Sequence, residues 1–146
     1  MADGSILAPG AAPDLKKDSY LGADCRGMNF YHADPAFKQL LDLYLPSDLR
    51  HHMEPHFDKL GSLCGGRLNE LSQLAERHDP ILHARDRFGR DEEWIEYHPA
   101  YKEMEKIALH DLGLHAMTNR PGVFDWPNTL PYLVKYAIQY LFVQSE

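Results

Sequence analysis

The most restrictive feature of the sequence is its last apolar segment, TLPYLVKYAIQYLFVQ at residues 129–144. We expect a helix here, with Thr129 as its N-cap. Over most of its length only Lys135 and Gln139 are polar. A helix that is apolar on nearly all sides is normally buried on most of them. A small layer of helices cannot cover it, so we expect another domain or another chain to pack on its far side.

Length and charge exclude several classes of protein. A chain of 146 residues can bury one core. Its net charge of −7 gives no support for binding to nucleic acid, which normally needs a basic surface. The two cysteines, Cys25 and Cys64, form no CxxC pattern, which favours a reducing, cytoplasmic location. No apolar run is long enough to span a bilayer, so no membrane partner is expected. Residues 1–28, rich in Gly, Ala, Pro and Asp, predict a mobile lead.

Three helices are predicted after this lead. Asp34 as N-cap and Pro35 at the first helical position begin one that ends before Pro46. Ser47 is expected to cap a second helix, which Pro55 should kink. Gly65-Gly66 supplies a break, and a third helix follows at about 67–78. The apolar positions expected to face inward on the first and third helices are Phe37, Leu40, Leu41 and Tyr44, then Leu68, Leu71, Leu74 and Ala75.

Residues 81–98 interrupt the helical pattern. Two extended runs, 81–86 and 93–97, flank a turn that contains Gly89, which predicts a β-hairpin. A two-stranded hairpin is marginal alone, so we expect it to pack against the helices. Pro99 then begins a fourth helix with Tyr101 opening its inward stripe, and Gly113 suits the position after its end. The loop 118–128 is apolar, so we expect it to pack against another part of the protein. The fold class is therefore mainly α, with about five helices in an up-down orthogonal arrangement and one small hairpin.

Three segments together resemble a known family: NFYHADPAFKQLL, ARDRFGRDEEWIEYHPAY and LPYLVKYAIQYLFVQSE. They are similar, in the same order, to the N-terminal helical domain of acyl-CoA dehydrogenases, and most of all to the AidB-like, adaptive-response branch. The resemblance covers about residues 29–146. It implies that a β domain and a C-terminal helical bundle follow in the parent enzyme, which is typically a tetramer, binds FAD and oxidises acyl-CoA thioesters.

In that family most flavin contacts, and usually the catalytic base, come from the two later domains. The resemblance therefore assigns no catalytic residue to this chain. It implies that the chain alone is inactive and holds no FAD stably. Its expected partners are the middle and C-terminal domains or other subunits, reached through the last helix, with a homo-oligomer and acyl-CoA in the parent.

Candidate sites within the chain are few. Tyr132, Tyr136 and Tyr140 lie at i, i+4 and i+8, so they form one stripe on the last helix. This stripe predicts domain-interface packing, and the resemblance makes a role in lining the acyl channel an alternative. His52 and His56 have the spacing of a helical zinc pair, but the pattern is not H-E-x-x-H and Pro55 intervenes, so no metal is expected. The acidic residues of the hairpin (Asp91, Glu92, Glu93 and Glu96) indicate a solvated face rather than acid–base catalysis.

Two functions remain open from the sequence. The chain is the N-terminal domain of an AidB-like, FAD-dependent acyl-CoA dehydrogenase that contributes domain packing, oligomer assembly and part of the acyl-channel wall. Alternatively, it is an autonomous helical interaction or oligomerisation module without enzymatic activity.

Overall fold

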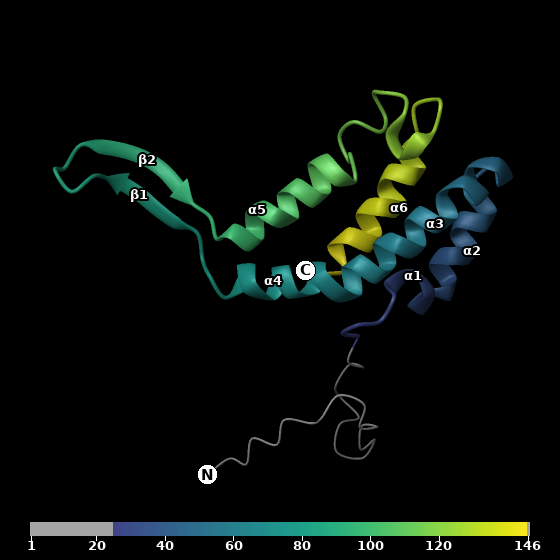
Figure 1. Ribbon diagram of the computed structural model, residues 1–146, viewed down its shortest axis with the longest axis horizontal. Coiled ribbons are helices and arrows are strands. Elements are labelled where there is room, and N and C mark those ends of the chain that lie inside the picture. Colours follow the sequence, from purple (N-terminus) through teal and green to yellow (C-terminus); the bar gives the residue numbers. More distant parts are fainter. Residues whose placement is uncertain (1–24, 146) are drawn as a thin grey trace, which may run out of the picture.

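In the computed structural model, which describes residues 25–145, helices surround one core and a two-stranded antiparallel sheet projects from it (Figure 1). The predicted mainly α fold with one hairpin is confirmed. The lead predicted at 1–28 lies, up to residue 24, outside the described residues. The elements are α1 (Phe30–Ala33), α2 (Pro35–Tyr44), α3 (Ser47–Leu63), η1 (Cys64–Leu68), α4 (Asn69–Glu76), β1 (Ile81–Arg85), β2 (Asp91–Glu96), α5 (Pro99–Lys106), η2 (Ile107–Asp111), η3 (Val123–Asp125) and α6 (Tyr132–Val143).

Side-chain caps begin the first two helices. The Asn29 carboxamide oxygen accepts from the backbone N–H of Tyr31 at 3.0 Å, which starts the short α1 that the sequence analysis did not predict. The Asp34 carboxylate accepts from the N–H of Phe37 at 2.9 Å, with Pro35 at the first helical position. The predicted start of α2 is therefore confirmed, both in its position and in the residue that caps it.

The long helix α3 differs in detail from the prediction. Ser47 is its first helical residue rather than its cap, and no side chain caps this end. The helix continues through Pro55 to Leu63. The change of direction comes at Gly66, whose φ of −109° and ψ of −105° are non-helical within the π-helical turn η1. The predicted glycine break is thus confirmed, and α4 follows from it.

Two other glycines let the N-terminal segment lie directly on α3 and η1. A side chain at Gly61 would collide with Asn29 and Tyr31, and one at Gly65 would collide with the carbonyl of Met28. The Gly27 N–H donates to the carbonyl of Gly65 at 2.7 Å. Backbone therefore packs on backbone here, which only glycine permits.

The core is formed where α1, α2, α3, α5 and α6 meet. Tyr31 stacks on Phe57 with ring centroids 5.8 Å apart, and Phe37 meets Phe57 edge-on. Met53, Leu68 and other apolar residues complete one continuous cluster. Leu40 and Tyr44, expected to face inward with Phe37, are exposed instead, and Leu74 is only partly covered.

The hairpin is correctly predicted but its packing is not. Ile81 pairs with Glu96 and His83 with Trp94, and a bulge follows before Arg85. No residue of either strand is buried, and the strands project beyond α4 and α5 (Figure 1). The expectation that the hairpin packs against the helices is therefore wrong. Helices α4 and α5, which precede and follow the hairpin in the sequence, pack on each other instead.

The joint between the hairpin and α5 is an N-cap. The His98 ring nitrogen Nδ1 accepts from the N–H of Ala100 at 3.2 Å, and Pro99 begins the helix. Tyr101, expected to be inward, is exposed and stacks on Tyr97 with centroids 4.7 Å apart. At the far end Gly113 has a φ of +58°, which suits the predicted position after the helix.

The last helix, α6, begins at Tyr132, three residues later than predicted, with Pro131 rather than Thr129 before it and no side-chain cap. Its inward face is buried (Val134, Ala137, Ile138, Leu141 and Phe142). Its outward face, which includes Tyr132 and Tyr136, is exposed. None of the helices formed by residues 25–145 combines the length and the apolar character needed to cross a membrane.

The backbone contact at Gly65 yields a test of the fold. We expect Gly65→Ala to lower the free energy of unfolding by about 1–3 kcal/mol, because the added methyl overlaps the Met28 carbonyl. Urea denaturation followed by circular dichroism measures this change. Glu76→Ala, at an exposed helical position, should change stability by less than about 0.5 kcal/mol. Equal effects of the two substitutions would contradict the close approach.

Candidate functional site

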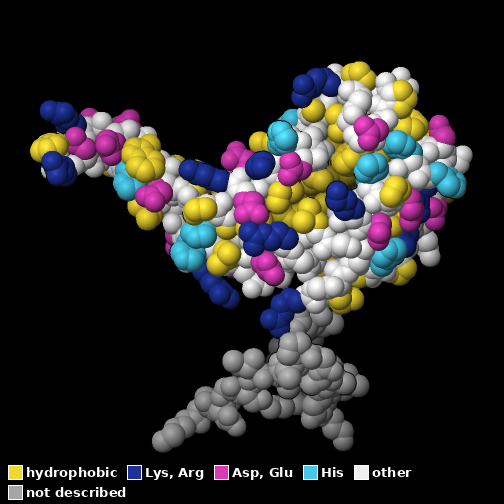
Figure 2. All heavy atoms as spheres, viewed as in Figure 1, with side chains coloured by type: hydrophobic (Ala, Val, Ile, Leu, Met, Phe, Trp, Pro, Cys, Tyr) yellow, Lys and Arg dark blue, Asp and Glu magenta, His cyan; other side chains and the backbone are white. Residues whose placement is uncertain are grey.

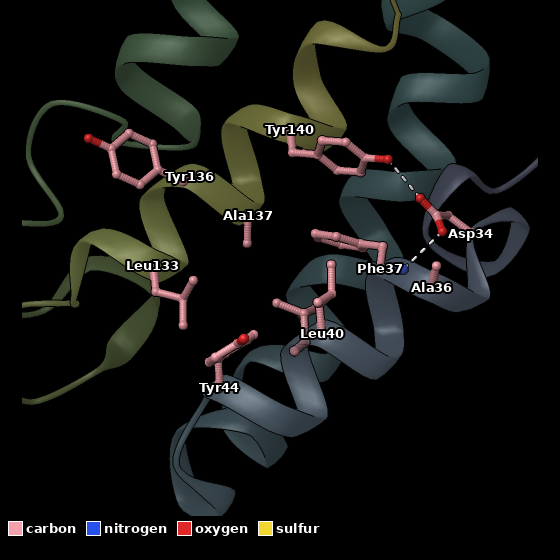
Figure 3. A pocket seen from close by; sticks show the side chains of 10 residues that line it. Asp34, Ala36, Phe37, Leu40, Tyr44, Leu133, Tyr136, Ala137 and Tyr140 are labelled. Atoms are coloured by element: carbon pink, nitrogen blue, oxygen red, sulfur yellow. Dashed lines mark hydrogen bonds between the residues drawn. The ribbon is translucent and has the colours of Figure 1, made fainter.

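An apolar groove lies between α2 and the outward face of α6 (Figure 3). Its volume is about 410 Å³. Leucine, tyrosine and phenylalanine side chains form its walls, and Ala137 leaves space between them. The lining residues are Asp34, Ala36, Phe37, Leu40, Leu41, Tyr44, Leu133, Tyr136, Ala137 and Tyr140. The lining of the groove is almost wholly apolar.

A single polar corner closes one end of the groove. The Tyr140 hydroxyl donates to the Asp34 carboxylate at 2.7 Å (Figure 3). The backbone N–H of Phe37 and this hydroxyl hold the pKa of Asp34 below its usual range, so the carboxylate is charged at neutral pH. The same bond raises the pKa of Tyr140. The Tyr140 ring also stacks on Phe37, with centroids 4.8 Å apart. Together these contacts fix α6 against the start of α2.

The three tyrosines predicted as one stripe divide in the structure. Tyr136 and Tyr140 line the groove, whereas Tyr132 does not, although its ring stacks on Tyr136 at 6.2 Å. Tyr132 and Tyr136 are 61% and 60% exposed. Two of the three candidate residues therefore lie at one concave apolar surface.

The sequence analysis missed the α2 side of this groove. Leu40 and Tyr44 were assigned to the core with Phe37, but they face α6 across the groove (Figure 3). A signal was present, because Leu40, Leu43 and Tyr44 add a second apolar stripe to the one formed by Phe37 and Leu41. An apolar arc wider than one face indicates a helix in contact on two sides.

A second, mixed hollow of about 720 Å³ lies between α3, α5 and the loop around Phe124. The His52 side-chain nitrogen Nε2 hydrogen-bonds to the Phe124 carbonyl at 2.7 Å, and the His56 ring packs on Phe124 at 4.8 Å. Burial, followed by the neighbouring His52, lowers the pKa of His56. These histidines hold the apolar loop 118–128 on the core, as the sequence predicted for the loop. No group of three metal-ligating side chains occurs in residues 25–145.

Reactive groups are not assembled elsewhere in the described part of the chain. Burial raises the pKa of the Cys64 thiol to about 12, so a thiolate nucleophile is not available at neutral pH. The carboxylates of β2 are exposed, as expected for a solvated face. The α2/α6 groove therefore has the chemistry to contact an apolar group.

The family model of the adaptive response protein AidB N-terminal domain matches residues 22–146. The chain belongs to this family. It is an N-terminal domain of the AidB-like acyl-CoA dehydrogenase branch, as the three sequence segments indicated. Among curated proteins no match was found.

A solved structure titled "Bd2924 apo-form" has a similar fold, with a TM-score of 0.69 and 23% sequence identity. The match covers 82% of this chain and 23% of the other. The chain thus spans about a quarter of the length of that solved structure's chain. At this level of identity the likeness concerns the fold alone.

The described residues do not fit a flavin dinucleotide. Its pyrophosphate would need positively charged side chains or backbone N–H donors. The charged residue of the groove is instead Asp34, a carboxylate. In the second hollow Lys59 and Lys106 are balanced by Glu103, Asp111 and Asp125. Neither site offers an anion a favourable field.

The bond between Tyr140 and Asp34 gives a pH-dependent test. We expect Tyr140→Phe to lower the free energy of unfolding by about 1 kcal/mol near pH 7, because it removes a hydrogen bond to a charged acceptor. A depressed carboxylate pKa stabilises the fold above the unfolded value of 3.8 and ceases to do so as the pH falls through the folded value. The difference between wild type and variant should therefore shrink below about pH 3.8, as measured by urea denaturation at several pH values. Tyr132→Phe, whose ring lies outside the groove, is the control; a difference that stays constant with pH would contradict the contact.

Proposed function

We propose that this domain supplies the α2/α6 face on which the flavin-binding domains of an AidB-like, FAD-dependent acyl-CoA dehydrogenase pack, and that the groove forms part of the acyl-channel wall. The observation that carries the proposal is the groove itself. It is apolar, and it lies on the helix that the sequence predicted to need a second partner.

The energetics favour covering this face. Leu40, Tyr44 and Tyr136 are each more than half exposed. Burying apolar surface contributes about 25 cal/mol per Å², so covering about 300 Å² on this face would contribute roughly 7 kcal/mol before ordering costs. A contiguous exposed patch of this kind typically marks an interaction site. Domain packing would therefore account for the exposed apolar side chains on the outer half of α6.

The groove also has the chemistry of an acyl channel. An alkyl chain requires walls without polar groups, and Leu40, Leu133 and Tyr136 provide them. The polar corner at Asp34 is anionic, so it would repel a free carboxylate and tolerate a neutral chain end. Tyr136 and Tyr140 are thus the candidate channel residues, with Tyr132 at the domain interface.

The proposal also covers the cofactor, the oligomeric assembly and the cellular location of the parent enzyme. FAD would be held by the domains that follow in the parent, with acyl-CoA bound between them and this face. The parent would be a homo-oligomer in the cytoplasm. The alternative is an autonomous interaction or oligomerisation module without enzymatic activity, and the exposed outer face of α6 and α2 favours it equally well.

Flavin binding separates a domain from a complete enzyme. We expect the purified chain, mixed with FAD and passed through gel filtration, to retain no flavin absorbance and to oxidise no acyl-CoA, because its described hollows lack an anion site. Flavin retained near one equivalent, together with acyl-CoA turnover, would overturn the proposal of an inactive domain.

Domain docking tests the groove directly. We expect the chain to bind separately produced middle and C-terminal domains of an AidB-like acyl-CoA dehydrogenase, and Leu40→Lys or Tyr136→Lys to weaken this binding at least about tenfold, or ~1.4 kcal/mol, because each places a charge in the interface. Isothermal titration calorimetry gives the dissociation constants. Leu109→Lys, an exposed leucine outside the groove, is the matched control. Binding that Leu109→Lys weakens as much as Leu40→Lys would rule out the groove as the docking face.

A further inference from the structure

The groove between α2 and α6 has a charged end and an apolar end, so it can orient an occupant. Asp34 alone is charged among the residues that line it, and no cation in residues 25–145 forms an ion pair with this carboxylate. Tyr44 and Leu133 lie at the other end, about 15 Å away along α2 at 1.5 Å per residue (Figure 3). An elongated occupant with an apolar body and one cationic end therefore fits the groove.

The N-terminal lead of this chain has that composition. Residues 1–24 lie outside the described structure, but within residues 7–17 the sequence alternates. The odd positions are apolar until the last, which is basic: Leu7, Pro9, Ala11, Pro13, Leu15 and Lys17. The even positions are small or charged: Ala8, Gly10, Ala12, Asp14 and Lys16. Proline favours an extended backbone for itself and for the residue before it, and side chains of an extended chain alternate between two sides. Segment 7–17, when extended, therefore has one apolar side that ends in a lysine.

The length of the chain allows this lysine to reach the carboxylate. The Gly27 N–H donates to the Gly65 carbonyl at 2.7 Å, which fixes where the described chain begins on the core. Gly27 and Asp34 are seven residues apart, a separation of at most about 25 Å, whereas the ten residues from Lys17 to Gly27 can cover about 33 Å. Five further residues, counted back from Lys17, cover about 16 Å, which is the length of the groove.

We propose that residues 11–17 of the lead lie extended in the groove of their own chain, with Pro13 and Leu15 against its apolar walls and Lys17 paired with Asp34. A segment joined to its site by a short linker is present there at an effective concentration on the order of millimolar. Even a weak contact, with a dissociation constant of about 0.1 mM, would then be occupied about nine-tenths of the time. The lead thus shields the groove in the isolated domain. Docking of the flavin-binding domains is a separate step that would displace it.

The hairpin is the other exposed apolar surface of the described chain, and its charge makes it a poorer site for the lead. Leu82 and Phe88 are 66% and 69% exposed. Figure 2 shows basic side chains at the tip of the hairpin, beside Phe88, and both Arg87 and Arg90 lie over the Phe88 ring, at 4.6 and 5.8 Å. These arginines would repel the lysine end of the lead, whereas Asp34 attracts it. Charge complementarity therefore assigns the lead to the groove.

Paramagnetic broadening in the full chain tests the contact. A nitroxide label is attached at Ala12→Cys, on the side of the segment that faces away from the groove, in a Cys25→Ser background. Cys64 is buried and its thiol pKa is raised to about 12, so it does not take the label. We expect the label to broaden the backbone amide signals of Leu40 and Tyr136 and to leave that of Trp94, on the projecting hairpin, sharp.

Adjacent lysines supply matched variants with equal net charge. Lys17→Glu should lower the ratio of bound to free lead about fivefold, which corresponds to loss of an exposed ion pair of ~1 kcal/mol, and Lys17→Arg should retain the broadening. Lys16→Glu, on the outward side, should have little effect. Absence of broadening at Leu40 and Tyr136, or equal effects of Lys16→Glu and Lys17→Glu, would overturn the proposal. Broadening of an isotope-labelled chain by a separate spin-labelled chain would also overturn it, because the contact would then join two copies.

The same variants separate this inference from the proposed function. If the lead occupies the groove, Lys17→Glu should tighten binding of the middle and C-terminal domains, measured by calorimetry, because less lead has to be displaced. Binding of those domains without any broadening by the label would refute the lead contact alone. Broadening at the groove in a chain that binds no other domain would support the lead contact and refute the docking function.

Discussion

The structure depends on the burial of α6 along one face only. Its inner side chains complete the core with α2 and α3, while its outer side chains remain at the surface. A helix with this composition stabilises the fold through its inner half. Its outer half leaves apolar side chains in water unless another surface covers them. The groove follows from this imbalance, because α2 carries a second apolar stripe, with Leu40 and Tyr44, on the side that faces α6.

Packing at the N-terminal side of the core positions the start of α2, which forms one wall of the groove. Glycines at 61 and 65 allow the segment around Asn29 to lie on α3 with no side chain between. Asn29 then starts α1, and Asp34 both starts α2 and binds Tyr140 of α6. One carboxylate therefore links a local helix start to a tertiary contact 106 residues away. A shift of the N-terminal segment would move the polar corner of the groove with it.

Local chemistry made much of this fold predictable from the sequence. The Asp34-Pro35 start, the glycine break and the hairpin turn each depend on a few adjacent residues, and all three were correct. Errors arose where the outcome depended on distant packing. Leu40 and Tyr101 have core-like spacing but are exposed, because spacing on one helix does not show how far the core extends around it. The groove joins residues about 100 positions apart, so periodicity on either helix could predict a surface but not the cavity.

The two uncovered apolar surfaces, the groove and the hairpin, have different chemical characters. The groove is concave, nearly free of charge and lined by large aromatic and aliphatic side chains, and it suits burial against another domain or around an alkyl chain. The hairpin is an extended ribbon with no buried residue, and its strand β2 carries the carboxylates Asp91, Glu92, Glu93 and Glu96. Leu82 and Leu40 lie on separate elements, so the groove and the hairpin are two separate apolar surfaces of the domain.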